Sequence, residues 1–292
     1  MKKNNFHTHT YRCGHASGSE EEMVEAAIVM GLDNLGFSEH IPMPHYRQHL
    51  LKSINHIRSV RSALSFVKAF ILNGPGMRMP YKTMEEHLQA IDACQLKYQG
   101  KVVIYKGFEA EGIKEYFDYY QSLLDNGTVD YLILGHHFHD HCIQDCYYGR
   151  EKIEKKDLYL YCNEVEQAIE TELFSYLAHP DLFLIGYHKF DLDAQTVSRR
   201  ICEKAKEYNI PLEINAGGMR RGLHDINGEQ LYLYPNAHFW DIASEVGNDV
   251  IIGLDAHHPT HFDSAMYDRL VDFARLHKLH LIDNFTFKQG KK

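Results

Sequence analysis

Several features that mark whole classes of protein are missing from this 292-residue sequence. Its six cysteines form no Cys-x-x-Cys pair and no compact framework, which excludes a small disulfide-stapled scaffold. No run of 18 apolar residues occurs, and no apolar segment follows the cationic start Met1-Lys2-Lys3, so neither a membrane span nor a signal peptide is expected. The formal net charge of −9 disfavours a protein that coats nucleic acid. We therefore expect a cytoplasmic protein with no membrane partner and no nucleic-acid partner.

Histidine, by contrast, is abundant, with 21 residues dispersed along the chain. His7 and His9 are separated by a single residue directly after the apolar Phe6. Side chains two residues apart in a strand point to the same side, so these imidazoles would aim at one place, as metal binding requires. Asp255 and His257 repeat the same spacing near the other end of the chain.

Short apolar runs alternate with segments of helical periodicity about seven times. After the first strand near residue 6, strands are expected at 34–38, 102–105, 131–134, 175–178, 212–214 and 250–253. Helices are expected at about 20–30, 84–98, 113–125, 157–172, 194–208, 235–246 and 263–277. This alternation predicts an α/β fold with a parallel sheet that closes into a TIM-like barrel, in one domain spanning 1–292.

The segment at about 43–83 has a different character and is expected to be a basic helical insertion. No acidic residue occurs from Ile41 to Met84. Apolar residues recur there at three- and four-residue intervals from Leu50 to Ile71, which predicts one basic amphipathic helix. It is either a packed helix with a solvated basic face or a lid whose cations, among them Arg58, Arg61 and Lys68, attract an anionic substrate.

Candidate metal ligands follow the expected strands, at the end of the sheet where parallel α/β barrels carry their chemistry. They are His7, His9, His15, His40, Glu109, His137, His179, Asp255 and His257. Taken singly, each has an ordinary structural role, such as a hydrogen-bonded buried histidine or, for Asp255, a helix N-cap. Together they would leave polar groups buried and carboxylates converging unless cations were bound. Nine ligands imply two or three divalent transition-metal ions, and the mixture of imidazole and carboxylate suits Zn, Fe or Mn.

Six motifs run in order along the chain: His7-Thr8-His9-Thr10 with His15, Phe37-Ser38-Glu39-His40-Ile41-Pro42, Gly107-Phe108-Glu109, Gly135-His136-His137-Phe138, Ala178-His179-Pro180-Asp181 and Leu254-Asp255-Ala256-His257. Together they resemble the polymerase-and-histidinol-phosphatase (PHP) superfamily. The segments 38–44 and 213–220 resemble the monofunctional histidinol-phosphatase branch.

This resemblance implies a distorted (β/α)7 barrel with a trinuclear metal site made by the nine residues above. It implies hydrolysis of L-histidinol phosphate, a small phosphate monoester, to L-histidinol and phosphate in histidine biosynthesis. Glu109 stands where two ions are bridged, and His137 rather than His136 matches the ligand position. Two departures are Glu111, where similar sequences often carry aspartate, and the segment 138–148.

The mechanism we expect is attack on phosphorus by a metal-bridging hydroxide held by Glu109 and Asp255. Arg220 is the candidate phosphate clamp because a guanidinium matches phosphate geometry, with Arg221 and Arg150 as alternatives. The acid for the leaving group is either Asp181 or a metal-bound water. The imidazole of histidinol would require a pocket with aromatic surface. Four aromatic residues lie in plausible loops or helix starts: Tyr116, Phe117, Tyr147 and Tyr148.

Other readings remain open. His139, His141, Cys142 and Cys146 form either a separate zinc site or a polar loop beside the main site. The enzyme is alternatively a phosphoesterase of the same fold that acts on nucleotides or nucleic-acid ends, or a non-catalytic metal-binding protein that kept the ligands.

Overall fold

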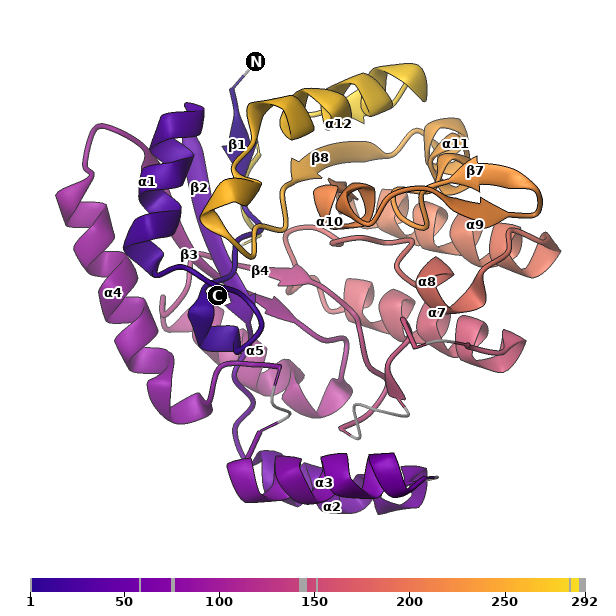
Figure 1. The fold of residues 1–292 in the computed structure, drawn as a ribbon, viewed down its shortest axis with the longest axis horizontal. Coiled ribbons are helices and arrows are strands. Elements are labelled where there is room, and N and C mark those ends of the chain that lie inside the picture. The colour runs from indigo at the N-terminus through magenta and orange to yellow at the C-terminus, as the bar shows by residue number, and fades with distance from the viewer. Residues whose placement is uncertain are drawn as a thin grey trace.

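The computed structural model describes residues 2–57, 59–74, 77–141, 146–150, 152–283 and 285–288. Parallel strands curl through the middle of the protein, and helices cover them on the outside (Figure 1). The strands are β1 (Asn4–Asn5), β2 (Asn34–His40), β3 (Val103–Ala110), β4 (Tyr131–Leu134), β5 (Leu212–Asn215), β6 (His224–Ile226), β7 (Glu229–Leu231), β8 (Asp249–Gly253) and β9 (His280–Leu281).

The longer helices confirm the expected alternation with strands. The α-helices are α1 (Glu20–Met30), α2 (Tyr46–Lys52), α3 (Val60–Leu72), α4 (Met84–Lys97), α5 (Phe117–Asp125), α7 (Lys155–Glu170), α8 (Leu184–Tyr187), α9 (Leu192–Glu207), α10 (Ala216–Arg220), α11 (Ala237–Val246) and α12 (Ser264–Leu276). Short 3-10 turns are η1 (Tyr11–Cys13), η2 (Ser53–His56), η3 (Tyr81–Thr83), η4 (Lys114–Tyr116) and η5 (Pro259–His261). In the described chain, none of the helices is both long enough and apolar enough to span a bilayer.

The curled sheet is parallel throughout its main body. One part has the order β1-β2-β3-β4, and the other has β5-β8-β9. Single parallel bridges from Leu177 to Leu134 and Leu212 connect β4 to β5, and a bridge from Thr8 to Ala256 lies where the chain leaves β1 and β8. The expected strand at 175–178 is thus present only as bridges through Leu177. The α/β class and the parallel sheet are confirmed.

Local sequence signals explain where the first helix begins and ends. The Ser19 side chain accepts a hydrogen bond from Glu22 N, and the Glu22 carboxylate accepts one from Ser19 N, which forms a capping box before α1. Gly31 ends the helix in the left-handed region at φ 78°. This helix therefore lies where the sequence predicted it.

An apolar plug fills the inside of the curled sheet beneath the candidate site. Phe6, Tyr131 and Tyr176 pack together there, and Phe285 and Phe287 of the last described segment join them. The Tyr131 hydroxyl donates to the carbonyls of residues 6 and 37, at 2.7 and 2.9 Å, so it ties β4 to the first two strands.

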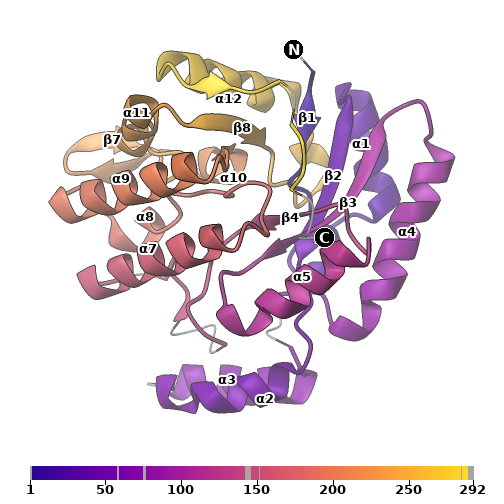
Figure 2. The same ribbon diagram turned by 180° about the vertical axis from the view of Figure 1, so that it is seen from behind.

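The insertion differs from the expected single helix, which was wrong. Helix α2 is followed by η2, and Ser59 then caps a separate helix, α3, by accepting from Ser62 N. The two helices lie side by side at one end of the molecule in both views (Figures 1 and 2). Tyr46 and Leu50 of α2 are buried in the main core, whereas Val60, Leu64 and Ile71 of α3 are 79%, 67% and 66% exposed. The apolar stripe of α3 is therefore turned outward, which disagrees with the packed-helix interpretation, one of the two left open above.

Four elements near the C-terminal half were not expected: the short helices α8 and α10 and the antiparallel hairpin β6–β7. The hairpin turns at Asn227 and Gly228, which have φ values of 55° and 87°. An Asn-Gly pair between two short strands is a strong hairpin signal, and it was present in the sequence. Strand β9, which adds to β8, is only two residues long and carries no comparable signal.

Candidate metal centre

Glu109, on β3, lies at the centre of the predicted site and is almost fully buried. Five imidazoles have a nitrogen within 3.5 Å of its carboxylate oxygens: His7, His9, His40, His137 and His179. The nearest atoms are His179 Nε2, 2.9 Å from Oε1, and His40 Nδ1, 2.9 Å from Oε2. Residues from four separate parts of the chain thus surround one carboxylate.

A glycine makes room for this carboxylate. Gly135 follows β4, and a Cβ placed on it would lie 1.9 Å from Glu109 Oε1. Any side chain at position 135 would therefore displace the carboxylate. Gly253 at the end of β8 plays the same part for Glu213, because a Cβ there would lie 1.7 Å from Glu213 Oε1. The glycines of the two motifs are explained by these close approaches.

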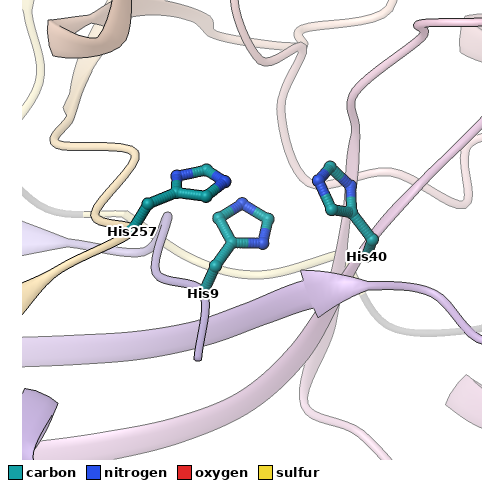
Figure 3. A group of neighbouring side chains, drawn as sticks. All are labelled: His9, His40 and His257. Carbon is teal, nitrogen blue, oxygen red and sulfur yellow. The ribbon is translucent and has the colours of Figure 1, made fainter. Parts of the chain in front are cut away.

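Asp255, His257 and His15 complete the group from the other side. Asp255 Oδ1 lies 3.5 Å from the Nε2 atoms of both His7 and His9. The Nε2 atoms of His257 and His15 are 3.1 Å apart. The rings of His9, His40 and His257 lie next to one another on separate segments (Figure 3), with His9 4.4 Å from His40 and 4.2 Å from His257 between ring centroids. All nine predicted ligand residues are therefore brought to one end of the sheet.

Two of these residues have strained backbones. His179 and Asp255 have φ values of 31° and 47°, in the left-handed region that residues other than glycine rarely adopt. Such strain persists only where surrounding contacts fix it, and it is concentrated at functional sites.

An outer layer of carboxylates orients three of the imidazoles. Glu213 Oε1 lies 2.8 Å from His7 Nδ1, Glu39 Oε1 lies 3.2 Å from His9 Nδ1, and Glu111 Oε1 lies 2.9 Å from His137 Nδ1. Each contact holds the Nδ1 side of the ring and leaves Nε2 facing Glu109, an arrangement typical of metal-binding histidines. Sequence analysis assigned no role to these glutamates, although Glu39 directly precedes a predicted ligand.

The ligand atoms that face the centre of the site are arranged to bind cations rather than to form hydrogen bonds with one another. His7 Nε2 and His9 Nε2 are buried and have no hydrogen-bond partner among the described residues, and His40 Nδ1 and Glu109 Oε2 make no hydrogen bond although they are 2.9 Å apart. Unpaired buried polar atoms are costly, and these are all ligand atoms for a divalent transition metal. Three sets offer ligand atoms within 4.8 Å of one another: His9, His40 and His257; His7, Glu109 and His179; and His7, His9 and Asp255.

The electrostatics favour the ligand forms of most of these groups. Burial would raise the pKa of Glu109, but the imidazoles of His40, His137 and His7 hold it well below its usual range, so the carboxylate is ionised. Burial lowers the pKa of His40 well below its usual value, which keeps this imidazole neutral. For His7 burial also acts to lower the pKa, but Glu213, Asp255 and Glu109 raise it well above its usual value. A surplus of negative charge that draws a proton to His7 would equally draw a divalent cation.

A cavity of about 600 Å³ opens beside these residues. Its wall carries several arginines: Arg61, Arg78, Arg150, Arg220 and Arg221. It also carries the aromatic rings of Phe138, Tyr147 and Tyr234. Arg220 is held by its Nη2, which donates to the carbonyls of Leu254 and Asp255 at 2.8 and 2.7 Å. Its Nη1 is buried and has no partner in the described structure. The space suits a small anionic molecule with a ring.

Two further candidates are bound elsewhere. Asp181 does not line the cavity: its Oδ2 accepts a hydrogen bond from Asn236 N at 2.6 Å, and burial raises its pKa to about 7. His136 is turned away from Glu109, because its Nδ1 accepts from Gly112 N and its Nε2 lies 2.8 Å from Glu164. Of the four aromatic residues named from the sequence, Tyr147 alone is among the cavity-lining residues of the described chain; Tyr116, Phe117 and Tyr148 pack into the core.

The alternative zinc site at 139–146 is only partly described, because Cys142 lies outside the described residues. His141 is engaged at both ring nitrogens, by Asp140 at 2.9 Å and by the Tyr116 hydroxyl at 3.1 Å. His261, which the sequence analysis did not single out, lines the main cavity, and its Nδ1 accepts from His257 N at 3.1 Å.

Comparison with known proteins places this geometry in context. The family model of the PHP domain matches residues 5–217. A protein named probable histidinol-phosphatase from Deinococcus radiodurans is 26% identical over 258 residues, which cover 87% of this chain and 85% of the relative.

Two solved structures have the same fold. The crystal structure of hisK from Listeria monocytogenes, which carries a provisional histidinol phosphatase name, has a TM-score of 0.67 and 20% identity, with 89% of this chain and 97% of that chain covered. The histidinol phosphate phosphatase of Lactococcus lactis, crystallised with zinc, L-histidinol and phosphate, has a TM-score of 0.66 and 16% identity, with 100% and 99% covered.

Proposed function

The chain belongs to the PHP domain family, and on that premise we propose that it is a metal-dependent phosphomonoesterase that hydrolyses L-histidinol phosphate to L-histidinol and phosphate. The observation that carries this proposal is the set of unpaired, buried ligand atoms around Glu109 beside a cavity lined by arginines. The names of the relatives, and the zinc, histidinol and phosphate in the Lactococcus structure, point to the same substrate.

Two or three divalent ions would be held by His7, His9, His15, His40, Glu109, His137, His179, Asp255 and His257. Zinc is favoured by the donor set and by the Lactococcus relative, and iron or manganese fit the same donors. Bound there, such ions supply Lewis acidity, which activates water and offsets the charge of a phosphate group. Glu109 and Asp255 provide the negative charge that retains them.

The chain's own residues bind and orient the ester. Arg220 lines the cavity and is anchored through Nη2, and its buried Nη1 lacks a partner, so this guanidinium is the proposed clamp for a phosphate oxygen. Arg221 lies 6.0 Å from the Tyr234 ring, and Arg150 is paired with Asp157 at 2.6 Å, which makes Arg150 the less available of the two. Tyr147, Tyr234 and Phe138 offer aromatic surface for the imidazole of histidinol.

The fold that carries this site is proposed to be a distorted (β/α)7 barrel in one domain, with residues 43–83 as an insertion. The support is the chain of single bridges that link β4 to β5 through Leu177, together with the bridge from Thr8 to Ala256. The metal-binding end of such a barrel is formed by the carboxyl ends of its strands.

The test is steady-state phosphate release from L-histidinol phosphate by protein reconstituted with zinc, manganese or iron. A nucleoside 3′,5′-bisphosphate is the competing substrate, because arginines from the basic insertion also line the cavity. His9→Ala is the inactive control. Faster turnover of the bisphosphate would replace the proposed substrate, and no turnover of either, or of an aryl phosphate, would favour a non-catalytic metal-binding protein.

A further inference from the structure

One cation of the insertion reaches the metal centre through a second residue. Arg78 lies between α3 and η3, in the segment that returns from the insertion, and is only 6% exposed. Its Nη2 donates to Glu111 Oε1, and its guanidinium lies 5.5 Å from the ring centroid of Phe138. A charged side chain of the insertion is thus buried in the wall of the site.

Glu111 connects this arginine to His137. It directly follows Ala110, the last residue of β3, and is fully buried. Its Oε1 lies 2.9 Å from His137 Nδ1, and its Oε2 accepts from the backbone N–H groups of His137 and Phe138. One carboxylate therefore fixes both the ring and the backbone of His137, whose Nε2 lies 3.5 Å from Glu109 Oε1.

A buried carboxylate in this position requires a counter-charge. The Arg78 guanidinium is the permanently charged group that donates to Glu111 Oε1. Without Arg78, this oxygen would keep only the His137 imidazole, and the carboxylate would be held by that ring and by the two backbone N–H groups. This change would disturb the orientation of Nε2 toward Glu109.

We propose that Arg78 is a positioning residue: by fixing Glu111 it orients His137 for metal binding, and so makes the metal centre depend on the insertion. This inference rests on the metal-binding part of the proposed function and is independent of which phosphate ester is the substrate. It also gives a reason for glutamate at position 111, because that side chain reaches the guanidinium and the imidazole with the same oxygen.

The experiment measures metal retained by the full-length protein, with zinc as the probe. Zinc-loaded wild type, Arg78→Gln and Arg78→Lys are dialysed against a series of zinc buffers, and bound metal is measured by mass spectrometry. Outer partners of metal-binding histidines contribute about 10- to 100-fold to metal affinity, so Arg78→Gln should weaken the most sensitive zinc step by that factor. Arg78→Lys should recover part of the loss, since its ammonium restores the charge without the fork of donors.

Two comparisons separate positioning from general damage to the insertion. Arg47 also stabilises the insertion, by donating to the carbonyls of Phe70 and Ile71, but makes no hydrogen bond or ion pair with the described residues of the site. Arg47→Gln should retain zinc as the wild type does. In a double-mutant cycle, Arg78→Gln should have little further effect once Glu111→Gln is present, because the two residues act in series.

Equal zinc affinity of Arg78→Gln and wild type would overturn the inference, as would additive effects of the two substitutions or an equal loss in Arg47→Gln. A wild-type protein that bound no zinc, manganese or iron would instead refute the proposed function itself. The two failures are therefore distinguishable.

Discussion

The sequence pattern predicts where side chains lie at the metal-facing end of the sheet, but not in the insertion that carries α2 and α3. At the sheet, residues scattered from position 7 to position 257 meet around Glu109, as their places after parallel strands predict. In the insertion, a strong helical pattern predicts the helix but not its orientation, and Val60 and Leu64 face outward. Strand topology fixes where a side chain must be, whereas amphipathicity fixes only that one face is apolar.

The largest expected effect lies at the centre of the site. Glu109→Gln removes the charge that faces five imidazoles, and we expect kcat/KM for phosphate release to fall by about 10³-fold or more. Glu166→Gln is the matched control, because Glu166 on α7 pairs with Arg200 on α9 and is not one of the nine predicted ligands. A Glu109→Gln enzyme with near wild-type activity would show that convergence at this end is not catalytic.

Removing metal should destabilise the sheet end, and the exposed face of α3 should not contribute to this change. At free metal about 1,000 times its dissociation constant, binding adds about 4 kcal/mol to the free energy of unfolding, which chelation would remove. We expect a clear fall in Tm by calorimetry when chelator is added. Chelator should lower the Tm of a Leu64→Ser variant, altered on the exposed face of α3, by the same amount as that of the wild type. A fall of different size in the variant would show that this face is coupled to the metal site.

Paired leucines sharpen the contrast in packing. Leu158 on α7 is fully buried, and Leu64 on α3 is 67% exposed. Leu158→Ala should lower the free energy of unfolding by about 2–5 kcal/mol, because it leaves a cavity. Leu64→Ala should change it by about 0.5 kcal/mol or less. Denaturant unfolding measures both, and similar losses would mean that the outer face of α3 is buried in solution.

Paired arginines compare the two regions within one cavity. Arg220→Ala should raise KM for the phosphate ester by about 10- to 100-fold, because a charged hydrogen bond is lost from an anchored side chain. Arg61→Ala, on α3, should change kcat/KM about fivefold or less, since an exposed charge is screened by solvent. Steady-state kinetics at low and high salt would decide, and the reverse ranking would support the lid interpretation of the insertion.

Most of the fold could be predicted from the sequence because the signals that mark its helices and strands are local. Ser19 and Gly31 delimit α1, and apolar runs mark β3, β4 and β8, so their order follows from alternation alone. The strand at 175–178 is reduced to bridges through Leu177, a matter of backbone geometry that side-chain pattern does not report. The division of the insertion into α2 and α3 depended on a cap at Ser59 that the apolar periodicity masked.

For the site, the inner shell was predictable and the outer shell was not. His7, His9, Asp255 and His257 follow strands at the same end, so their meeting requires only a parallel topology. Glu39 contacts His9 from 30 residues away in the chain, and Glu213 contacts His7 from 206 residues away. No spacing rule predicts contacts between such distant positions. The role of Arg78 could be predicted only by knowing the path that the insertion takes back to the sheet.

The central claim is that these nine side chains hold a group of divalent ions around Glu109. Anomalous diffraction from crystals of the protein loaded with zinc or manganese, collected on both sides of the metal edge, tests it directly. The account predicts two or three strong peaks at bonding distance from atoms of His7, His9, Glu109 and Asp255. A map of fully loaded crystals with no peak beside Glu109, or with metal only at other residues, would contradict it.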